Sequence, residues 1–233
     1  MSIAVGLRDW NHVVLCADRQ LTDANAGLKF EESKIFFWQS DNIEPLNTKT
    51  PFWKLGVSYV GDPDAAQNTF TDVMEAIEDA HREEEERIDE CFGLHFDYWR
   101  SVLLPVFASK DTKRLETLIA LQARHRCFLF KTKANQVVMG ERECIGGGDS
   151  SVLRYFADVV SRTETPTPDK ALTLGIYLVS LANRYVDGCG LGVNALILED
   201  EKPFRVLSKT ETEKYSERFA QFERKIEKEF FQT

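Results

Sequence analysis

The first residues of the chain, MSIAVGLRDWNHVVLCADRQ, predict two β-strands that begin almost at the amino terminus. Apolar Ile3, Val5 and Leu7 alternate with other residues, and a second apolar run over 13–17 follows a short polar break. Terminal residues fray unless other structure holds them. We therefore expect a sheet to hold the first strand, and the hydroxyl of Ser2 lies at the start of that strand.

Further strands gather towards both ends of the chain, with helices between them. Runs rich in apolar and β-branched residues, bounded by polar turns, predict these strands. We expect strands over 29–38, 52–60, 115–123, 127–131, 136–139, 192–198 and 204–207.

Helical periodicity predicts five helices. The clearest begins at Thr167, an N-cap residue followed by Pro168 at the first helical position. Its sequence is apolar nearly all round as far as residue 185, so we expect it to be buried between layers. The last helix has a capping box formed by Thr210 and Glu213. The other three helices are expected from about residue 64, over 89–108, and after the Gly146-Gly147-Gly148-Asp149 segment.

The order of these elements is strands, two helices, strands, two helices, strands and one helix. Helical hairpins between groups of strands suggest two stacked sheets with helices outside them. The sequence thus predicts an α/β (α+β) fold, a four-layer αββα sandwich of two stacked, mainly antiparallel sheets. The chain has 233 residues, of which 43% are hydrophobic, enough for a full core, and we expect a single domain over 1–233.

Composition argues against several classes of protein. No apolar stretch approaches the ~20 residues of a membrane span, and no basic segment precedes an apolar one, so we expect a soluble, cytoplasmic protein. The net charge of −9 argues against a nucleic-acid or anionic-membrane partner. The five cysteines are scattered without zinc-ligand spacing, which is typical of small buried hydrophobic residues.

Ser2, Asp18 and Lys34 follow one another at equal intervals of sixteen residues. The run HVVLCADRQLT over 12–22 contains the pattern Ala-Asp-x-x-x-Thr. Together with the segments 57–65, 145–148 and 184–190, these residues resemble proteasome β-type subunits and the related bacterial two-ring ATP-dependent protease. Both belong to the N-terminal-nucleophile (Ntn) hydrolases, and the resemblance covers roughly residues 2–207.

The resemblance implies that Ser2 acts as the nucleophile once Met1 is removed. A serine hydroxyl needs a base, and a terminal residue carries one in its own α-amine, whose unperturbed pKa is about 8. The Lys34 ammonium would favour the neutral amine and stabilise a developing alkoxide. Asp18 would hold Lys34 charged and in place. Without the resemblance, Asp18 and Lys34 would be interpreted as a surface ion pair.

The resemblance also implies roles for other residues. The amide of Gly61 is the implied oxyanion donor, and Asp187 is the group expected to contact the terminal amine or the hydroxyl of Ser2. No metal or cofactor is expected. The family binds extended peptide as an added strand, here along the segment with Thr22 and the segment after Gly61. The implied lining of the side-chain pocket is Leu21, Phe36 and Tyr59.

Three positions depart from the family pattern. Gly147 and Gly190 stand where the family has serines that orient the terminal amine. Pro63, which has no N–H, stands where the family binds the substrate backbone through an amide.

Three functions therefore stay open. The chain is expected to be a hydrolase that cleaves peptide or amide bonds through an acyl-enzyme on Ser2. The alternatives are a catalytically silent scaffold or binding subunit and a small-molecule amidase of the same superfamily. The expected partners are peptide or unfolded protein and other copies of the chain in a ring or related assembly. An ATPase partner is expected only by analogy.

Overall fold

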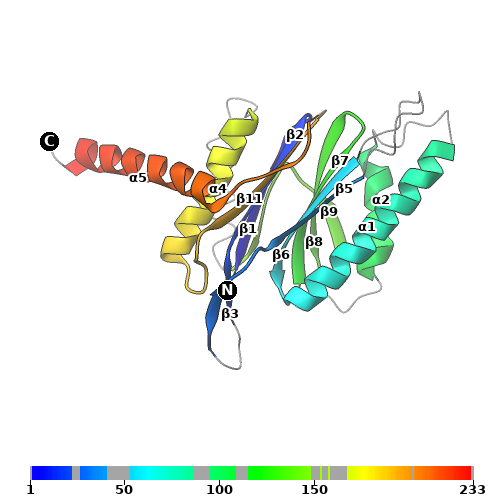
Figure 1. Cartoon of the computed structure of the whole chain (residues 1–233), viewed down its shortest axis with the longest axis horizontal. Coiled ribbons are helices and arrows are strands. Elements are labelled where there is room, and N and C mark those ends of the chain that lie inside the picture. Colours follow the sequence, from blue (N-terminus) through cyan, green and yellow to red (C-terminus); the bar gives the residue numbers. More distant parts are fainter. Residues whose placement is uncertain are drawn as a thin grey trace.

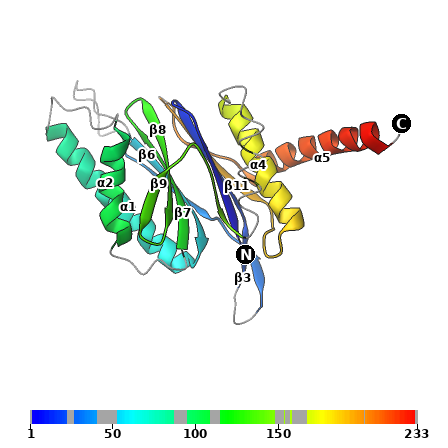
Figure 2. The same ribbon diagram turned by 180° about the vertical axis from the view of Figure 1, so that it is seen from behind.

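Two five-stranded antiparallel sheets lie face to face between two layers of helices, as Figures 1 and 2 show. This arrangement confirms the predicted αββα sandwich. A separate two-stranded sheet projects from one end. The computed structural model describes residues 2–22, 27–40, 53–86, 95–108, 115–147, 153, 157, 167–200 and 202–231.

The first sheet holds the amino-terminal strand between two neighbours. β1 begins at Ile3, as predicted, and pairs with β2 on one side and with β10 on the other. Strand β10 is not among the predicted strands, because it begins with two charged residues; Glu143 is nevertheless buried, 3.5 Å from Lys131 Nζ. The order is β10–β1–β2–β11–β12, with bounds Arg142–Gly146, Ile3–Arg8, His12–Asp18, Val193–Glu199 and Arg205–Val206.

The second sheet has the order β5–β6–β7–β8–β9, and the small sheet pairs β3 with β4. The single strand predicted over 29–38 is wrong, because two strands of different sheets, β4 and β5, occupy this stretch. Lys34, at the break, is buried in the interior. The bounds are β3 Gln20–Thr22, β4 Lys29–Glu31, β5 Ile35–Gln39, β6 Trp53–Gly61, β7 Leu115–Ala123, β8 Arg126–Lys133 and β9 Gln136–Met139.

Helices α1 and α2 cover the second sheet, while α4 covers the first and α5 packs against α4 (Figures 1 and 2). The predicted start of α4 is confirmed, since Thr167 Oγ1 accepts a hydrogen bond from Lys170 N at 3.4 Å. The first part of the helix expected over 89–108, residues 89–94, lies outside the described residues. So does most of the helix expected after residue 149, of which residues 153 and 157 are described and are helical. The bounds are α1 Pro63–Glu86, α2 Phe96–Ala108, α4 Pro168–Tyr185 and α5 Lys209–Phe231.

None of the helices within the described ranges is long and apolar enough to cross a membrane.

The capping box of α5 lies two residues before the predicted one. Ser208 N donates a hydrogen bond to Glu211 Oε2 at 2.9 Å, and Glu211 N donates to Ser208 Oγ at 3.3 Å. The prediction of Thr210 and Glu213 was therefore wrong. Both pairs fit the same sequence pattern, and the end of β12 at Val206 decides between them because it lets the helix begin at Lys209.

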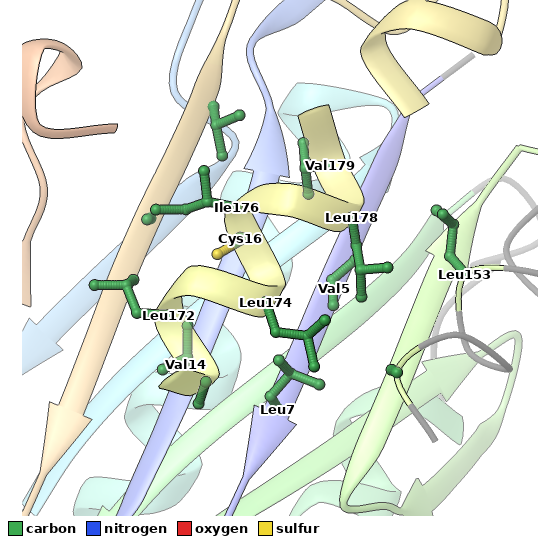
Figure 3. Close-up of a cluster of buried hydrophobic side chains, with 14 of the residues drawn as sticks. Val5, Leu7, Val14, Cys16, Leu153, Leu172, Leu174, Ile176, Leu178 and Val179 are labelled. Carbon is green, nitrogen blue, oxygen red and sulfur yellow. The ribbon is translucent and has the colours of Figure 1, made fainter. Parts of the chain in front are cut away.

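Three apolar layers separate the sheets and helices. In the layer between α4 and the first sheet (Figure 3), α4 approaches β2 closely at Gly175, where a Cβ atom would lie 2.8 Å from Cys16 Sγ. The expected burial of α4 between layers is confirmed, because Tyr177 on its other side stacks on Phe219 with ring centroids 4.3 Å apart. The cysteines within the described ranges, Cys16, Cys127, Cys144 and Cys189, are free and buried, as predicted.

A lysine is buried between the sheets at the start of β6. The Lys54 Nζ atom donates hydrogen bonds to the carbonyl oxygen of Glu199, at 2.6 Å, and to that of Lys202. Both carbonyls lie at the end of β11 or just beyond it. Burial lowers the pKa of Lys54, and these carbonyls replace the water that the ammonium loses on folding.

His12 should make the fold less stable in mild acid. Its side chain is 2% exposed, and its Nε2 atom has no hydrogen-bond partner among the described residues. Burial lowers the pKa of His12 below 6.5, although Asp9 and Glu199 oppose the shift. The unfolded chain then binds the proton more readily, so this contribution to stability is complete above about pH 6.5 and is lost below it.

Urea unfolding at pH 7.5 and pH 5.5 checks this prediction. The free energy of unfolding of the wild type should fall by about 1 kcal/mol more than that of His12→Gln. Equal pH dependence in the two proteins would contradict it.

Candidate active site

Ser2, Asp18 and Lys34 meet at one end of the two sheets. Ser2 precedes β1, and Asp18 is the last residue of β2, next to it in the same sheet. Lys34 directly precedes β5, the edge strand of the second sheet. The site therefore contains residues from both sheets, and the stacking of the sheets brings these residues together.

Lys34 links the other two residues through its ammonium group. Its Nζ atom donates hydrogen bonds to Ser2 Oγ at 2.7 Å and to Asp18 Oδ2 at 2.8 Å. The second oxygen of Asp18, Oδ1, accepts a hydrogen bond from Ile3 N at 2.8 Å. The aspartate thus orients the lysine and also fixes the backbone next to Ser2.

The Asp18–Lys34 pair is buried, and the alternative of a surface ion pair is therefore wrong: both side chains are 0% exposed. Burial lowers the pKa of Lys34 below its ordinary 10.5, while the charge of Asp18 opposes that shift. Residue Ser2 is partly exposed, and its hydroxyl contacts the buried ammonium of Lys34. A cation at such a position can stabilise negative charge that develops on the hydroxyl oxygen.

Two buried polar residues support the pair, and neither is among the predicted site residues. Asn194 Oδ1 accepts a hydrogen bond from Lys34 N at 3.2 Å. Gln20 N donates to Asp18 Oδ2 at 3.2 Å, and Gln20 Nε2 donates to Gly188 O at 3.1 Å. Asn194 interrupts an otherwise apolar run over 193–198, which is the signal that could have identified it, since buried polar groups need partners.

Gly190 leaves the space that Gln20 occupies. A Cβ atom on residue 190 would lie 2.9 Å from Gln20 Oε1. The glycine that departs from the family pattern therefore allows the Gln20 side chain to lie against the loop that follows α4.

The carbonyl group of Ser2 is held by the backbone after β10. Gly147 N donates a hydrogen bond to Ser2 O at 3.0 Å. Gly146 has φ +105°, and a Cβ atom there would lie 2.0 Å from Ser2 O. Glycine is required at 146 for both reasons.

Gly61 and Asp187 lie near the ends of elements. Gly61 is the last residue of β6 and has φ +129°, and Asp62 caps α1 by accepting hydrogen bonds from the amides of Asp64 and Ala65. Pro63 is the first residue of α1, where a missing N–H costs no helical hydrogen bond. Asp187 is exposed in the loop after α4. Within the described part of the chain, no hydrogen bond joins Gly61 or Asp187 to Ser2.

The four residues assigned to substrate binding lie in two places. Phe36 and Tyr59 stack on each other with ring centroids 5.4 Å apart, in an apolar cluster with Ala66 of α1. Burial raises the pKa of Tyr59 to about 12. Leu21 and Thr22 belong to β3 in the small sheet, where Leu21 is buried and Thr22 is exposed.

The described residues contain no cluster of His, Cys, Asp and Glu side chains that could hold a metal ion. Cys189 lies close enough to Asp18 and Lys34 to interact with their charges. Burial raises the pKa of its thiol to about 11, so this cysteine is protonated at neutral pH.

Neither a protein-family model nor a curated protein sequence matches this chain. Solved structures do match it. Anbu from Hyphomicrobium sp. strain MC1 is similar with a TM-score of 0.68 and 15% identity, over 96% of this chain and 96% of that chain. A (Gly-1) mutant of Anbu from the same organism has a TM-score of 0.69 and 13% identity, over 97% and 96%.

These matches correct the resemblance drawn from the sequence. The two similar structures named above are both of Anbu, a bacterial proteasome-like protein, so the narrower resemblance to proteasome β-type subunits and the two-ring ATP-dependent protease is wrong as stated. The spacing of Ser2, Asp18 and Lys34 follows from where β1, β2 and β5 begin and end, so it indicates the architecture and does not single out a family. The likeness shows the fold alone, and that fold is proteasome-like.

Proposed function

We propose that this protein is an Ntn hydrolase that cleaves peptide or amide bonds through an acyl-enzyme on Ser2 after removal of Met1. The observation that carries the proposal is the 2.7 Å hydrogen bond from the buried Lys34 ammonium to Ser2 Oγ. Asp18 pairs with the same ammonium at 2.8 Å. A hydroxyl on a partly exposed residue, in contact with a buried cation, is suited to nucleophilic attack.

In the proposed reaction, the α-amine of Ser2 takes the proton from its own hydroxyl. The Oγ atom then attacks the substrate carbonyl carbon, and Lys34 stabilises the negative charge on Oγ as it develops. The Gly61 amide is the proposed donor to the oxyanion, and Asp187 the proposed contact of the amine. The C–N bond breaks as the leaving amine accepts the proton from the α-ammonium. Water then attacks the ester carbonyl, the acyl group leaves as a carboxylic acid, and Ser2 Oγ regains its proton.

The proposal extends to substrate and assembly. Peptide or unfolded protein is the proposed substrate, bound along the segments with Thr22 and after Gly61 and with Leu21, Phe36 and Tyr59 nearest to it. A homo-oligomer, a ring or related assembly, is proposed from the likeness to Anbu. An ATPase partner stays a prediction by analogy.

Mass spectrometry of the purified protein tests the proposal. The intact mass should show that Met1 is absent. Treatment with a β-lactone, whose carbonyl acylates an activated hydroxyl, should add one lactone to the wild type and none to Ser2→Ala. Ser101→Ala, at an exposed serine on α2, is the matched control and should be labelled like the wild type.

Two results would overturn the proposal: Met1 retained in every molecule, or labelling that does not depend on Ser2. Either result would favour the silent scaffold, to which Gly147, Gly190 and Pro63 also point. Rapid turnover of small amides without cleavage of unfolded protein would instead favour the small-molecule amidase.

A further inference from the structure

We infer that Glu116 is a positioning residue that holds Ser2 in place from the second sheet. The inference rests on the proposed function, because it concerns the proposed nucleophile. Glu116 lies near the start of β7, and none of the sequence motifs includes it. Its carboxylate reaches across to β10 of the first sheet, where Oε2 accepts a hydrogen bond from Gly146 N at 3.2 Å.

Gly146 and Gly147 transmit this contact to Ser2. The next amide along the chain, Gly147 N, donates to the carbonyl oxygen of Ser2 at 3.0 Å. Gly146 itself presses against that carbonyl so closely that a Cβ atom would lie 2.0 Å from it. A rotation of the backbone at Gly146 would therefore move both the Gly147 amide that donates to Ser2 O and the Gly146 backbone that contacts the same oxygen.

Lys133 orients the carboxylate. Its Nζ atom lies 2.8 Å from Glu116 Oε1, directly across the β7–β8 pairing, in which Glu116 is opposite Lys133. The two oxygens of Glu116 thus have separate partners, one a side chain of its own sheet and one the backbone of the other sheet. A hydrogen bond from a backbone amide to a carboxylate is charge-assisted and stronger than one between neutral groups.

Ser2 is consequently fixed on two sides. Asp18 holds the peptide after Ser2, through Ile3 N, from the β2 side. Glu116 holds its carbonyl, through Gly146 and Gly147, from the β10 side. The 2.7 Å contact between Ser2 Oγ and Lys34 depends on both, because a displacement of about 1 Å would leave hydrogen-bond range.

Three variants separate positioning from general stability. Glu116→Leu removes the acceptor, whereas Glu116→Gln keeps an oxygen that can accept from Gly146 N. Lys133→Met removes only the orienting charge, at an exposed side chain, so it tests the same contact if Glu116→Leu does not fold. The matched control is Glu141→Leu, at an exposed glutamate of the neighbouring turn that pairs with Arg8.

The readouts are the rate of β-lactone labelling of Ser2 and the hydrogen exchange, by mass spectrometry, of the peptide that covers 142–147. Glu116→Leu should slow labelling and speed exchange by about tenfold each, since the amide loses a charged acceptor. Glu116→Gln should stay within about twofold of the wild type, and Lys133→Met should lie between them. Glu141→Leu should change neither readout.

Unchanged exchange and labelling in Glu116→Leu would overturn the inference. Changes in labelling and exchange as large in Glu116→Gln as in Glu116→Leu would also overturn it, because a residue that acts by positioning should be replaceable by one that keeps the accepting oxygen. If the wild type is not labelled at all, the proposed function fails, and the exchange of 142–147 still decides whether Glu116 holds this turn.

Discussion

Lys34→Met should slow the acylation of Ser2 by at least about 100-fold and lower the free energy of unfolding by about 3–5 kcal/mol. Methionine fills nearly the same volume but carries no charge, so the variant isolates the loss of the ammonium. Ser2 Oγ loses the donor at 2.7 Å, and Asp18 becomes a buried carboxylate without its counter-ion. Labelling kinetics and urea unfolding measure the two effects.

Lys202→Met is the matched control, because Lys202 forms an exposed pair with Glu199 at 2.8 Å. Its effect on stability should stay below about 1 kcal/mol. The double variant with Asp18→Asn should be less destabilised than the sum of the single variants, since it leaves no unpaired charge in the interior. Simple additivity would show that the two groups are not coupled, against the geometry described above.

Gly146→Ala should destabilise the protein by about 3 kcal/mol or more and abolish labelling of Ser2. The new Cβ atom would lie 2.0 Å from Ser2 O and 3.1 Å from Ile3 Cα. Both are backbone atoms, one of Ser2 and one of the first residue of β1, so the clash cannot be relieved by rotating a side chain. The positive φ of 105° adds strain that alanine does not tolerate. Thermal unfolding and β-lactone labelling measure the outcome.

Gly27→Ala is the control for the strain of a positive φ alone, without a steric clash. Gly27 also has a positive φ, +66°, but a Cβ atom there would have no neighbour within 4 Å among the residues that the structure describes. Its cost should be about 1 kcal/mol, with labelling unchanged. If both variants cost the same, the close approach to Ser2 is not what makes Gly146 necessary.

Local sequence patterns were enough to predict the architecture, because both sheets are buried in the same way. Each sheet is covered on one face by helices and on the other by the second sheet, so its central strands are almost wholly apolar and easy to recognise, as in residues 13–17. The cap at Thr167 was predictable because it depends only on its neighbours in the chain.

The parts that failed depend on which residues face one another in space. Nothing local decides between Ser208 and Thr210 as the start of α5. The break between β4 and β5 follows from the burial of Lys34, which only the stacked sheets make possible. Asn194 contacts Lys34 across 160 residues of chain, and Glu116 contacts Gly146 across 30 residues and between two sheets. A single sequence contains no signal for either contact.

The two interior lysines also bear on how the sheets are aligned with each other. An apolar layer is non-directional and would tolerate one sheet sliding over the other. Lys34 and Lys54 both belong to the second sheet side of that layer and lie at its opposite ends. Lys34 contacts Asp18 at the end of β2, and Lys54 binds a carbonyl oxygen at the far end of β11. A slip by one residue, roughly 3.4 Å, would pull both ammonium groups off their oxygen partners together. The same lysine proposed to serve Ser2 thus also helps to set the longitudinal alignment of the whole sandwich.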